Sequence, residues 1–249
     1  MKTLATVLLI IAVAVATAVA LLPASLVDGR IAAATQGRVR LAEAAGTVWN
    51  GRGVLADSAG TWRIALGWTI SKIDVLRGMR TVTLHPVDGA SLPTGTVEAV
   101  DDGVRVRGLR VEMPAQALAS ALPMRPMTVF GGMVTLSSPD LAWNDQAKAG
   151  ALEAHWRGAR VVSGDRMADL GAVDVAATVQ DSRIAGKVTN TGGDVRVDGT
   201  VTVAGDSIAV DATMAPNPGA PADIARALAS AGTPDANGNV RIGWRGSLR

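Results

Sequence analysis

Cysteine and tyrosine are absent from this chain of 249 residues, and phenylalanine occurs once. Without cysteine the chain can form neither a disulfide nor a catalytic thiolate, so its stability must come from the burial of apolar side chains. Hydrophobic residues make up 48% of the chain, and its interior must be built from valine, leucine, alanine and a few tryptophans. The absence of cysteine does not identify the redox compartment of the protein, because a periplasmic protein need not contain disulfides.

Residues suited to catalysis are scarce as well. The two histidines, His85 and His155, have no acidic neighbour at helical metal-ligand spacing and no accompanying triad signature. Asp101-Asp102-Gly103 lies between two strand-like runs and predicts a turn, while Gly192-Gly193-Asp194 lacks the helix that a phosphate-binding loop requires. We therefore expect no enzymatic activity, no cofactor and no metal.

Basic residues are dispersed along the chain. The formal net charge is +2, and no stretch contains five or six basic residues in succession. Nucleic-acid binding is therefore not expected.

One long apolar run stands near the N-terminus. Leu4–Leu22 has 19 residues without a charge, which is the length that crosses a bilayer core. Its leucine, isoleucine and valine residues together favour insertion by about 3–6 kcal/mol. The alternative is a cleaved signal peptide, for which Ala18-Val19-Ala20 offers small residues, but the run is longer than a usual signal core. We expect a single-pass membrane anchor over residues 1–22 and one β-rich domain, outside the cytoplasm, over residues 23–249.

Strict alternation of apolar residues between Gly171 and Met214 predicts an antiparallel meander. Two-residue turns at Asp181-Ser182 and Gly205-Asp206 pair the apolar positions across each hairpin. The expected pairs are Val179 with Ile184, Val175 with Val188, Val203 with Ile208, Val201 with Val210, and, across the loop at residues 190–193, Val188 with Val195. One face of this sheet is apolar and still needs a cover.

Earlier in the chain, the alternation of apolar residues changes parity at Gly108, which predicts a bulge and therefore a bent strand. Only Pro114–Leu122 and Pro221–Ala231 are typical of helices. The expected fold is mainly β: a curved, largely antiparallel sheet, forming an incomplete barrel or an open groove, with two short helices and one preceding transmembrane helix.

A tryptophan followed by asparagine or arginine and then glycine occurs at Trp49, Trp156 and Trp244, at irregular spacing that excludes a solenoid repeat. The simpler interpretation is that each tryptophan packs on the sheet. The alternative is that these residues are anchors for a partner. The partner-binding candidates on that hypothesis are Trp49, Asn50, Trp62, Trp156 and Trp244.

The most specific motif is the hexapeptide Gly46-Thr47-Val48-Trp49-Asn50-Gly51, whose Asn50-Gly51 pair permits positive φ. Together with residues 22–26 before it and residues 60–66 after it, this segment resembles the type II secretion system protein N family. The resemblance is clear to about Leu76 and looser through the remainder, to Trp244-Arg245-Gly246. It implies one inner-membrane span, a periplasmic β domain and an accessory role in exporting folded proteins across the outer membrane.

Three functions compete on these grounds. The first is an interaction protein that contacts the inner-membrane platform or the secretin of the type II secretion machine. The second is a lipid-binding or lipid-transfer protein of the envelope, because the Val/Ala/Ile stripe could line a groove for acyl chains. An extracytoplasmic hydrolase ranks last, because no nucleophile and base can be nominated.

Overall fold

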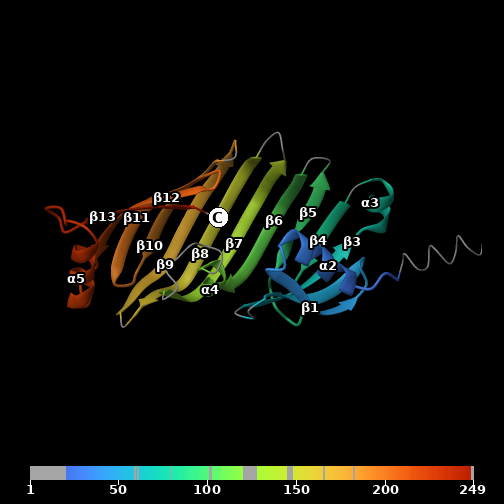
Figure 1. The fold of residues 1–249 in the computed structure, drawn as a ribbon, viewed down its shortest axis with the longest axis horizontal. Coiled ribbons are helices and arrows are strands. Elements are labelled where there is room, and N and C mark those ends of the chain that lie inside the picture. The colour runs from blue at the N-terminus through green and yellow to red at the C-terminus, as the bar shows by residue number, and fades with distance from the viewer. Residues whose placement is uncertain are drawn as a thin grey trace, which may run out of the picture. The chain divides into compact units, whose positions relative to one another are not determined.

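The computed structural model describes residues 21–58, 60, 62–78, 80–100, 103–119, 128–144, 148–164, 166–181 and 183–247 (Figure 1). The chain forms two compact units, Met1–Glu98 and Ala99–Arg249. Both units are built from antiparallel strands that pair with their neighbours in chain order. The predicted mainly-β class is therefore confirmed.

Within the described part of the first unit, helix α2 comes first, and the strands that follow it run up and down beside one another. Its elements are α2 (Ser25–Ala34), β1 (Val39–Gly46), β2 (Asn50–Asp57), β3 (Arg63–Ile70), α3 (Lys72–Leu76) and β4 (Arg80–His85), and β5 (Thr94–Val100) follows. Strand pairing runs in the order β1, β2, β3 and β4. Neither α2 nor α3 was predicted, so the expectation of only two internal helices is wrong.

Helix α2 covers the core of this unit. Ala24, Leu41, Leu66 and Trp68 are buried together, and Val27 and Ile31 of the helix pack against them. The apolar residues of α2 are not concentrated on one helical face, so its sequence lacks the periodicity of an amphipathic helix. Tertiary contacts, rather than intrinsic pattern, hold this helix in place.

The second unit contains the longest strands of the chain. Its elements are β6 (Gly103–Pro114), α4 (Ala115–Ala119), β7 (Thr128–Asn144), β8 (Lys148–Ser163), β9 (Arg166–Gln180), β10 (Arg183–Thr191), β11 (Val195–Ala204), β12 (Ser207–Pro216), α5 (Ala222–Ala231) and β13 (Val240–Ser247). Each strand lies antiparallel to the next, from β6 to β13. Among the described pairings none joins β6 to β13, so the sheet of this unit is open.

The predicted meander is confirmed in both of its tight hairpins. Val179 lies opposite Ile184, and Val203 lies opposite Ile208. The two pairs expected deeper in these hairpins, Val175 with Val188 and Val201 with Val210, are also present. The parity of apolar positions is therefore sufficient to set register when a two-residue turn joins the strands.

The register predicted across the loop from β10 to β11 is wrong. Val188 lies opposite Gly199, not Val195, because the β10–β11 ladder closes around a wider turn. The Asn190 side chain holds this turn: its Oδ1 accepts the Val197 N–H at 2.6 Å, and its Nδ2 donates to the carbonyl oxygens of Val195 at 2.6 Å and Leu170 at 2.8 Å. The observed register differs from the predicted one by an even number of residues, so the apolar stripe stays on the same face of the sheet.

The bulge predicted at Gly108 is not found between β6 and β7, whose register is the same on both sides of this residue. Gly108 does have a positive φ of 57°. Register shifts do occur between β7 and β8, near Gly132 and between Ser137 and Leu141.

Helix α5 covers part of the apolar face. Ile224 and Leu228, four residues apart, pack on a cluster formed by Val195, Val197 and Ala212. The prediction of a helix at Pro221–Ala231 is confirmed, with Pro221 as the residue before the first turn. The predicted helix at Pro114–Leu122 is described as α4 over Ala115–Ala119, and its last three residues lie outside the described part of the chain.

The predicted membrane segment lies outside the described residues except for Leu21 and Leu22. Among the helices that the structure does describe, none combines the length and the apolar character needed to cross a bilayer. The membrane anchor and the single periplasmic domain therefore stay predictions.

Candidate functional site

The hexapeptide Gly46–Gly51 is the loop that joins β1 to β2. Gly46 lies opposite Gly51 at the last pair of the hairpin. Within the loop, Thr47 N–H donates to the Asn50 carbonyl at 2.9 Å, and Asn50 N–H donates to Thr47 Oγ1 at 3.1 Å. The loop is thus a closed, internally hydrogen-bonded turn between two strands.

Both terminal glycines are required, for different reasons. Gly46 has φ of +88°, and a Cβ there would lie 2.6 Å from the carbonyl oxygen of Asn50. A Cβ on Gly51 would lie 2.4 Å from Cζ2 of Trp68 and 2.7 Å from the Thr47 carbonyl oxygen. Positive φ was expected at Asn50-Gly51, but it occurs at Gly46. Gly51 is needed because the buried indole of Trp68 occupies the space of a side chain.

The loop binds the chain segment that follows the predicted membrane span. Val48 N–H donates to the Leu22 carbonyl at 2.9 Å, and Ala24 N–H donates to the Gly46 carbonyl at 3.1 Å. Pro23 forms an antiparallel bridge with Thr47 between these two bonds. We call residues 22–24 together with residues 46–51 the junction.

Strand β3 supports the junction from its other side. Trp68 Nε1 donates to the Val48 carbonyl at 2.9 Å, and Ile70 N–H donates to the Trp49 carbonyl at 2.7 Å. Trp68 is only 4% exposed, so its hydrogen bond is shielded from water. Trp68 is therefore the residue that fixes the loop, and the sequence analysis did not single it out.

Asp28 ties helix α2 to strand β1 beside the junction. Its carboxylate accepts two hydrogen bonds from Arg40, at 3.0 Å from Nε and 2.6 Å from Nη2, and one from the backbone N–H of Leu41 at 2.8 Å. These donors, with that of Arg40 the strongest, lower the pKa of Asp28 to about 2. The negative charge is retained at any ordinary pH.

Three candidate partner-binding residues lie in the first unit. Trp49 is half-buried in the junction, with Nζ of Lys72 5.8 Å from its ring centroid, and Asn50 beside it is exposed. Trp62 is half-buried after the β2–β3 turn, where its N–H donates to Asp57 at 3.2 Å. The structure therefore brings Trp49 and Asn50 together and places Trp62 outside the junction.

Trp156, in the second unit, packs against the sheet. Its Nε1 donates to the Gly131 carbonyl at 2.8 Å, and its ring lies 6.0 Å from that of Phe130, centroid to centroid. Trp156 is half-buried, and these contacts account for both the polar and the apolar part of its side chain.

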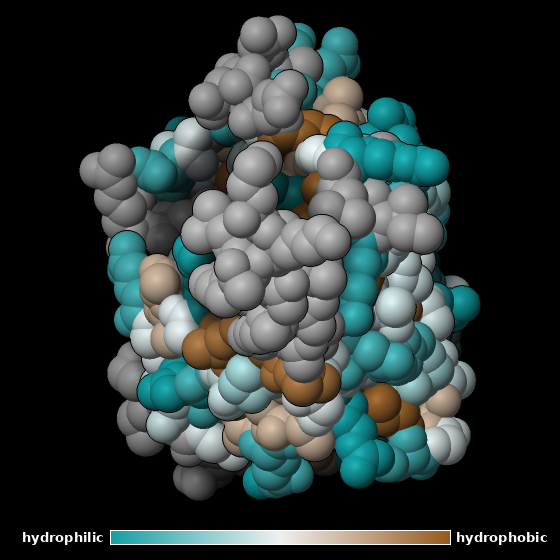
Figure 2. Space-filling model, turned by 90° about the vertical axis from the view of Figure 1, so that its right-hand side faces the viewer, coloured by the Kyte–Doolittle hydropathy of each residue, from teal (hydrophilic) through white to brown (hydrophobic). Residues whose placement is uncertain are grey.

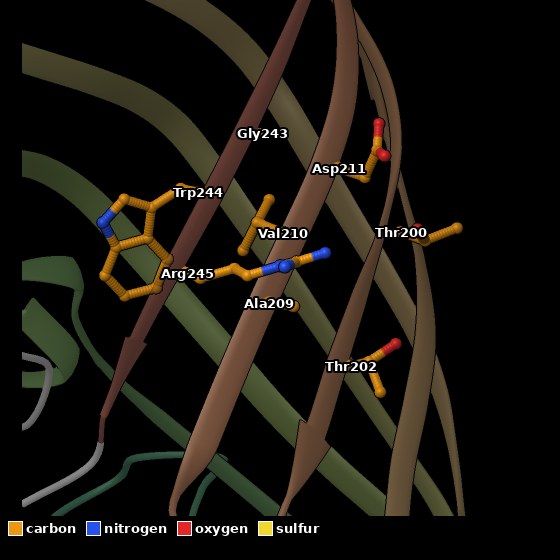
Figure 3. Close-up of a pocket in the computed structure, with 8 residues that line it drawn as sticks. All are labelled: Thr200, Thr202, Ala209, Val210, Asp211, Gly243, Trp244 and Arg245. Atoms are coloured by element: carbon orange, nitrogen blue, oxygen red, sulfur yellow. The ribbon is translucent and has the colours of Figure 1, made fainter.

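Trp244 differs from Trp156 because it stands on β13, with 37% of its surface exposed. It lies opposite Val210, and its indole occupies the space above Gly246. Figure 3 shows Trp244 and Arg245 pointing to opposite sides of the strand, Arg245 toward the side that carries Thr200 and Asp211. A depression over β11, β12 and β13 is lined mainly by Thr200, Thr202, Ala209, Asp211, Trp244 and Arg245.

A second exposed tryptophan, Trp143, was not among the candidates. It is 44% exposed near the end of β7, with Nζ of Lys148 4.4 Å from its ring centroid. The sequence does not distinguish Trp143 from a tryptophan that packs on the sheet. The register of β7 shifts between Ser137 and Leu141, so the alternation of inward and outward side chains cannot be followed to this residue.

His155 pairs with Asp174 across β8 and β9, where both side chains are about half exposed. Within the described part of the chain, no group of three or more histidine, cysteine or acidic residues is placed to hold a metal ion. The pair is an exposed cross-strand contact that stabilises the sheet.

Comparison with protein families gives a match over most of the chain. The model of type II secretion system protein N matches residues 37–243. The chain belongs to this family. The matched region begins before β1, includes the Gly46–Gly51 loop and ends in β13, so the resemblance seen in the sequence is confirmed over most of the chain. Comparison with curated proteins and with solved structures finds no significant match.

Proposed function

We propose that this protein is an accessory component of the type II secretion system: a membrane-anchored periplasmic interaction protein that supports export of folded proteins across the outer membrane. The family match over residues 37–243 carries the proposal. Membership in this family of secretion accessory proteins also favours a non-enzymatic role.

The junction supports the anchored arrangement. Leu22, the last residue of the predicted span, accepts a hydrogen bond from Val48, so the folded unit holds the chain directly after the apolar run. An anchor joined in this way transmits its position to the folded unit without a flexible linker. We place Leu4–Leu22 in the inner membrane and the residues that follow in the periplasm.

Strand β13 is the surface that we assign to a protein partner, either the inner-membrane platform or the secretin. In the described structure β12 is the strand paired with β13, and Pro234 bridges only Val240 at its start. The edge from Arg241 to Ser247 therefore presents main-chain groups to which a partner strand can add. Trp244 adds an exposed aromatic side chain, the residue type enriched at interaction hot spots.

Co-purification of the full-length protein from its native membrane, after gentle extraction, tests this assignment. We expect platform or secretin subunits to accompany the wild type and to be reduced at least several-fold with Trp244→Ala. Trp143→Ala is the matched control, since Trp143 is also an exposed tryptophan of this unit. Isolation of the wild type free of every secretion component would count against the proposal.

Lipid binding is the alternative function, and the uncovered part of the apolar face favours it. Val175, Ile184, Val201, Val203 and Val210 are only half-buried, whereas the cluster under α5 involves Val195, Val197 and Ala212. Lipid retained by the purified protein and identified by mass spectrometry would support this alternative, and its absence together with recovered secretion subunits would exclude it.

A further inference from the structure

We infer that the junction end of the first unit lies directly on an anionic membrane surface, with α3 as its contact element. The inference rests on the membrane anchor of the proposed function. The residues that form this surface are Leu21, Leu26, Trp49, Lys72, Val75 and Arg77.

Chain length places the junction at the membrane. Ala24 is only two residues beyond the end of the predicted span at Leu22, and two residues of extended chain reach about 7 Å. Because residues 22–24 are hydrogen-bonded to the Gly46–Gly51 loop, the loop cannot move away from the end of the span without breaking these bonds.

Strand register places α3 at the same end of the sheet. Thr69, the penultimate residue of β3, lies opposite Asn50 of the loop, and α3 begins two residues after β3 ends. The position of Lys72 Nζ, 5.8 Å from the ring centroid of Trp49, confirms that helix and loop are neighbours. Helix α3 therefore lies at the end of the first unit that the membrane surface would contact.

Large apolar side chains are exposed at this end. Leu21 is 65% exposed, Leu26 in the first turn of α2 is 51% exposed, and Val75 of α3 is 37% exposed. Figure 2 shows this end of the molecule, where brown hydrophobic residues alternate with teal hydrophilic ones. Trp49 adds an aromatic side chain of the kind enriched at bilayer interfaces. Burial of these residues in the interface would remove apolar surface from water.

The charges of this end suit anionic lipid. Lys72 and Arg77 form no ion pair among the described residues, whereas the paired arginines Arg40 and Arg63 lie toward the other end of the strands, both opposite Ala56 of β2. Asp74 is the one acidic residue of α3, so the helix and the residue after it carry an excess of positive charge. Each basic residue held near an anionic surface contributes about 1 kcal/mol of attraction, which salt screens.

The test uses full-length protein in nanodiscs of phosphatidylcholine alone or with 30% phosphatidylglycerol. Because the chain has no cysteine, Val75→Cys gives a unique site for an environment-sensitive fluorophore. Ser58→Cys is the control, because Ser58 follows β2 at the end opposite the junction, about 25 Å away along the strand. Spin-labelled lipids report contact by quenching the fluorophore.

We expect quenching at position 75 to exceed that at position 58 at least threefold, and to be stronger with phosphatidylglycerol. Lys72→Gln with Arg77→Gln should lower it at least twofold, as should 0.5 M salt. Arg38→Gln, a charge removed just before β1 at its far end, should leave it unchanged. Equal quenching at positions 75 and 58 in the wild type would overturn the inference.

Carbonate extraction of native membranes separates the two claims. If the wild type stays in the membrane while the label at position 75 is not quenched, the anchor stands and the surface contact is wrong. If carbonate releases the protein, the anchor fails and the surface inference fails with it.

Discussion

Gly51→Ala tests the structural role of the junction most severely. The new methyl carbon would lie 2.4 Å from Trp68 Cζ2 and 2.7 Å from the Thr47 carbonyl oxygen, whereas ordinary contact begins near 3.4 Å. Either the buried indole or the loop must shift by about 1 Å, which costs about 1–3 kcal/mol as overpacking. Displacing Trp68 also endangers its hydrogen bond to Val48, worth about 1 kcal/mol. We expect the unfolding free energy of the first unit to fall by about 2–4 kcal/mol.

Hydrogen exchange of peptides from β1, β2 and β3 is the suitable assay, because it reports the stability of the first unit by itself. Gly29→Ala is the matched control: Gly29 lies in helix α2 and a Cβ there meets nothing within 4 Å. This control should be neutral or stabilise the helix by up to about 1 kcal/mol. Gly51→Ala combined with Trp68→Phe should lose less than the sum of the single changes, because the clashing ring atom is removed. A Gly51→Ala protein as stable as wild type would refute the reasoning.

Three further predictions concern single interactions. The pKa of Asp28 is about 2 in the folded protein, against an ordinary value of 3.8, so its charged form stabilises the fold by about 1–2 kcal/mol. This stabilisation is complete above pH 4 and is lost as pH falls through 2. Acid unfolding followed by circular dichroism should show that Asp28→Asn removes this pH dependence. Asn190→Ala leaves buried groups of the β10–β11 turn without partners, so chemical denaturation should show a loss of about 2–3 kcal/mol, and a loss under 0.5 kcal/mol would contradict the assigned bonds. Trp156→Phe removes the bond to Gly131 and should cost about 1–2 kcal/mol by the same assay, against no change for Trp143→Phe.

The hairpins β9–β10 and β11–β12 of the second unit could be predicted because one physical rule governs them. Apolar residues alternate, and a two-residue turn fixes which positions face each other, so the Val179–Ile184 and Val203–Ile208 pairs followed from local sequence. The β10–β11 register did not follow, because it depends on hydrogen bonds from the Asn190 side chain to residues five and seven positions away and to Leu170. Helix α2 did not follow because contacts distant in sequence stabilise it.

The candidate site was half predicted. The hexapeptide stood out as a short strand and turn closed by glycines. Glycine is required at position 51 because the indole of Trp68, 17 residues away, fills the space of a side chain, and at position 46 because the backbone of Asn50 does so. Pairing of residues 22–24 with the loop is also nonlocal, so the two segments that carried the family resemblance gave no sign that they touch. The structure distinguishes the tryptophans by their exposure. Trp156 packs on the sheet and hydrogen-bonds Gly131, whereas Trp244 on β13 is exposed.

Photo-crosslinking in native membranes tests the central claim most directly. A benzophenone amino acid at Trp244 of the full-length protein, with Thr178 on the polar face of β9 as the control position, would be activated in cells that assemble the secretion machine, and the attached peptides identified by mass spectrometry. The account predicts platform or secretin peptides from position 244 at a clear excess over position 178. Crosslinks to lipid alone, or to no secretion component from either position, would contradict it.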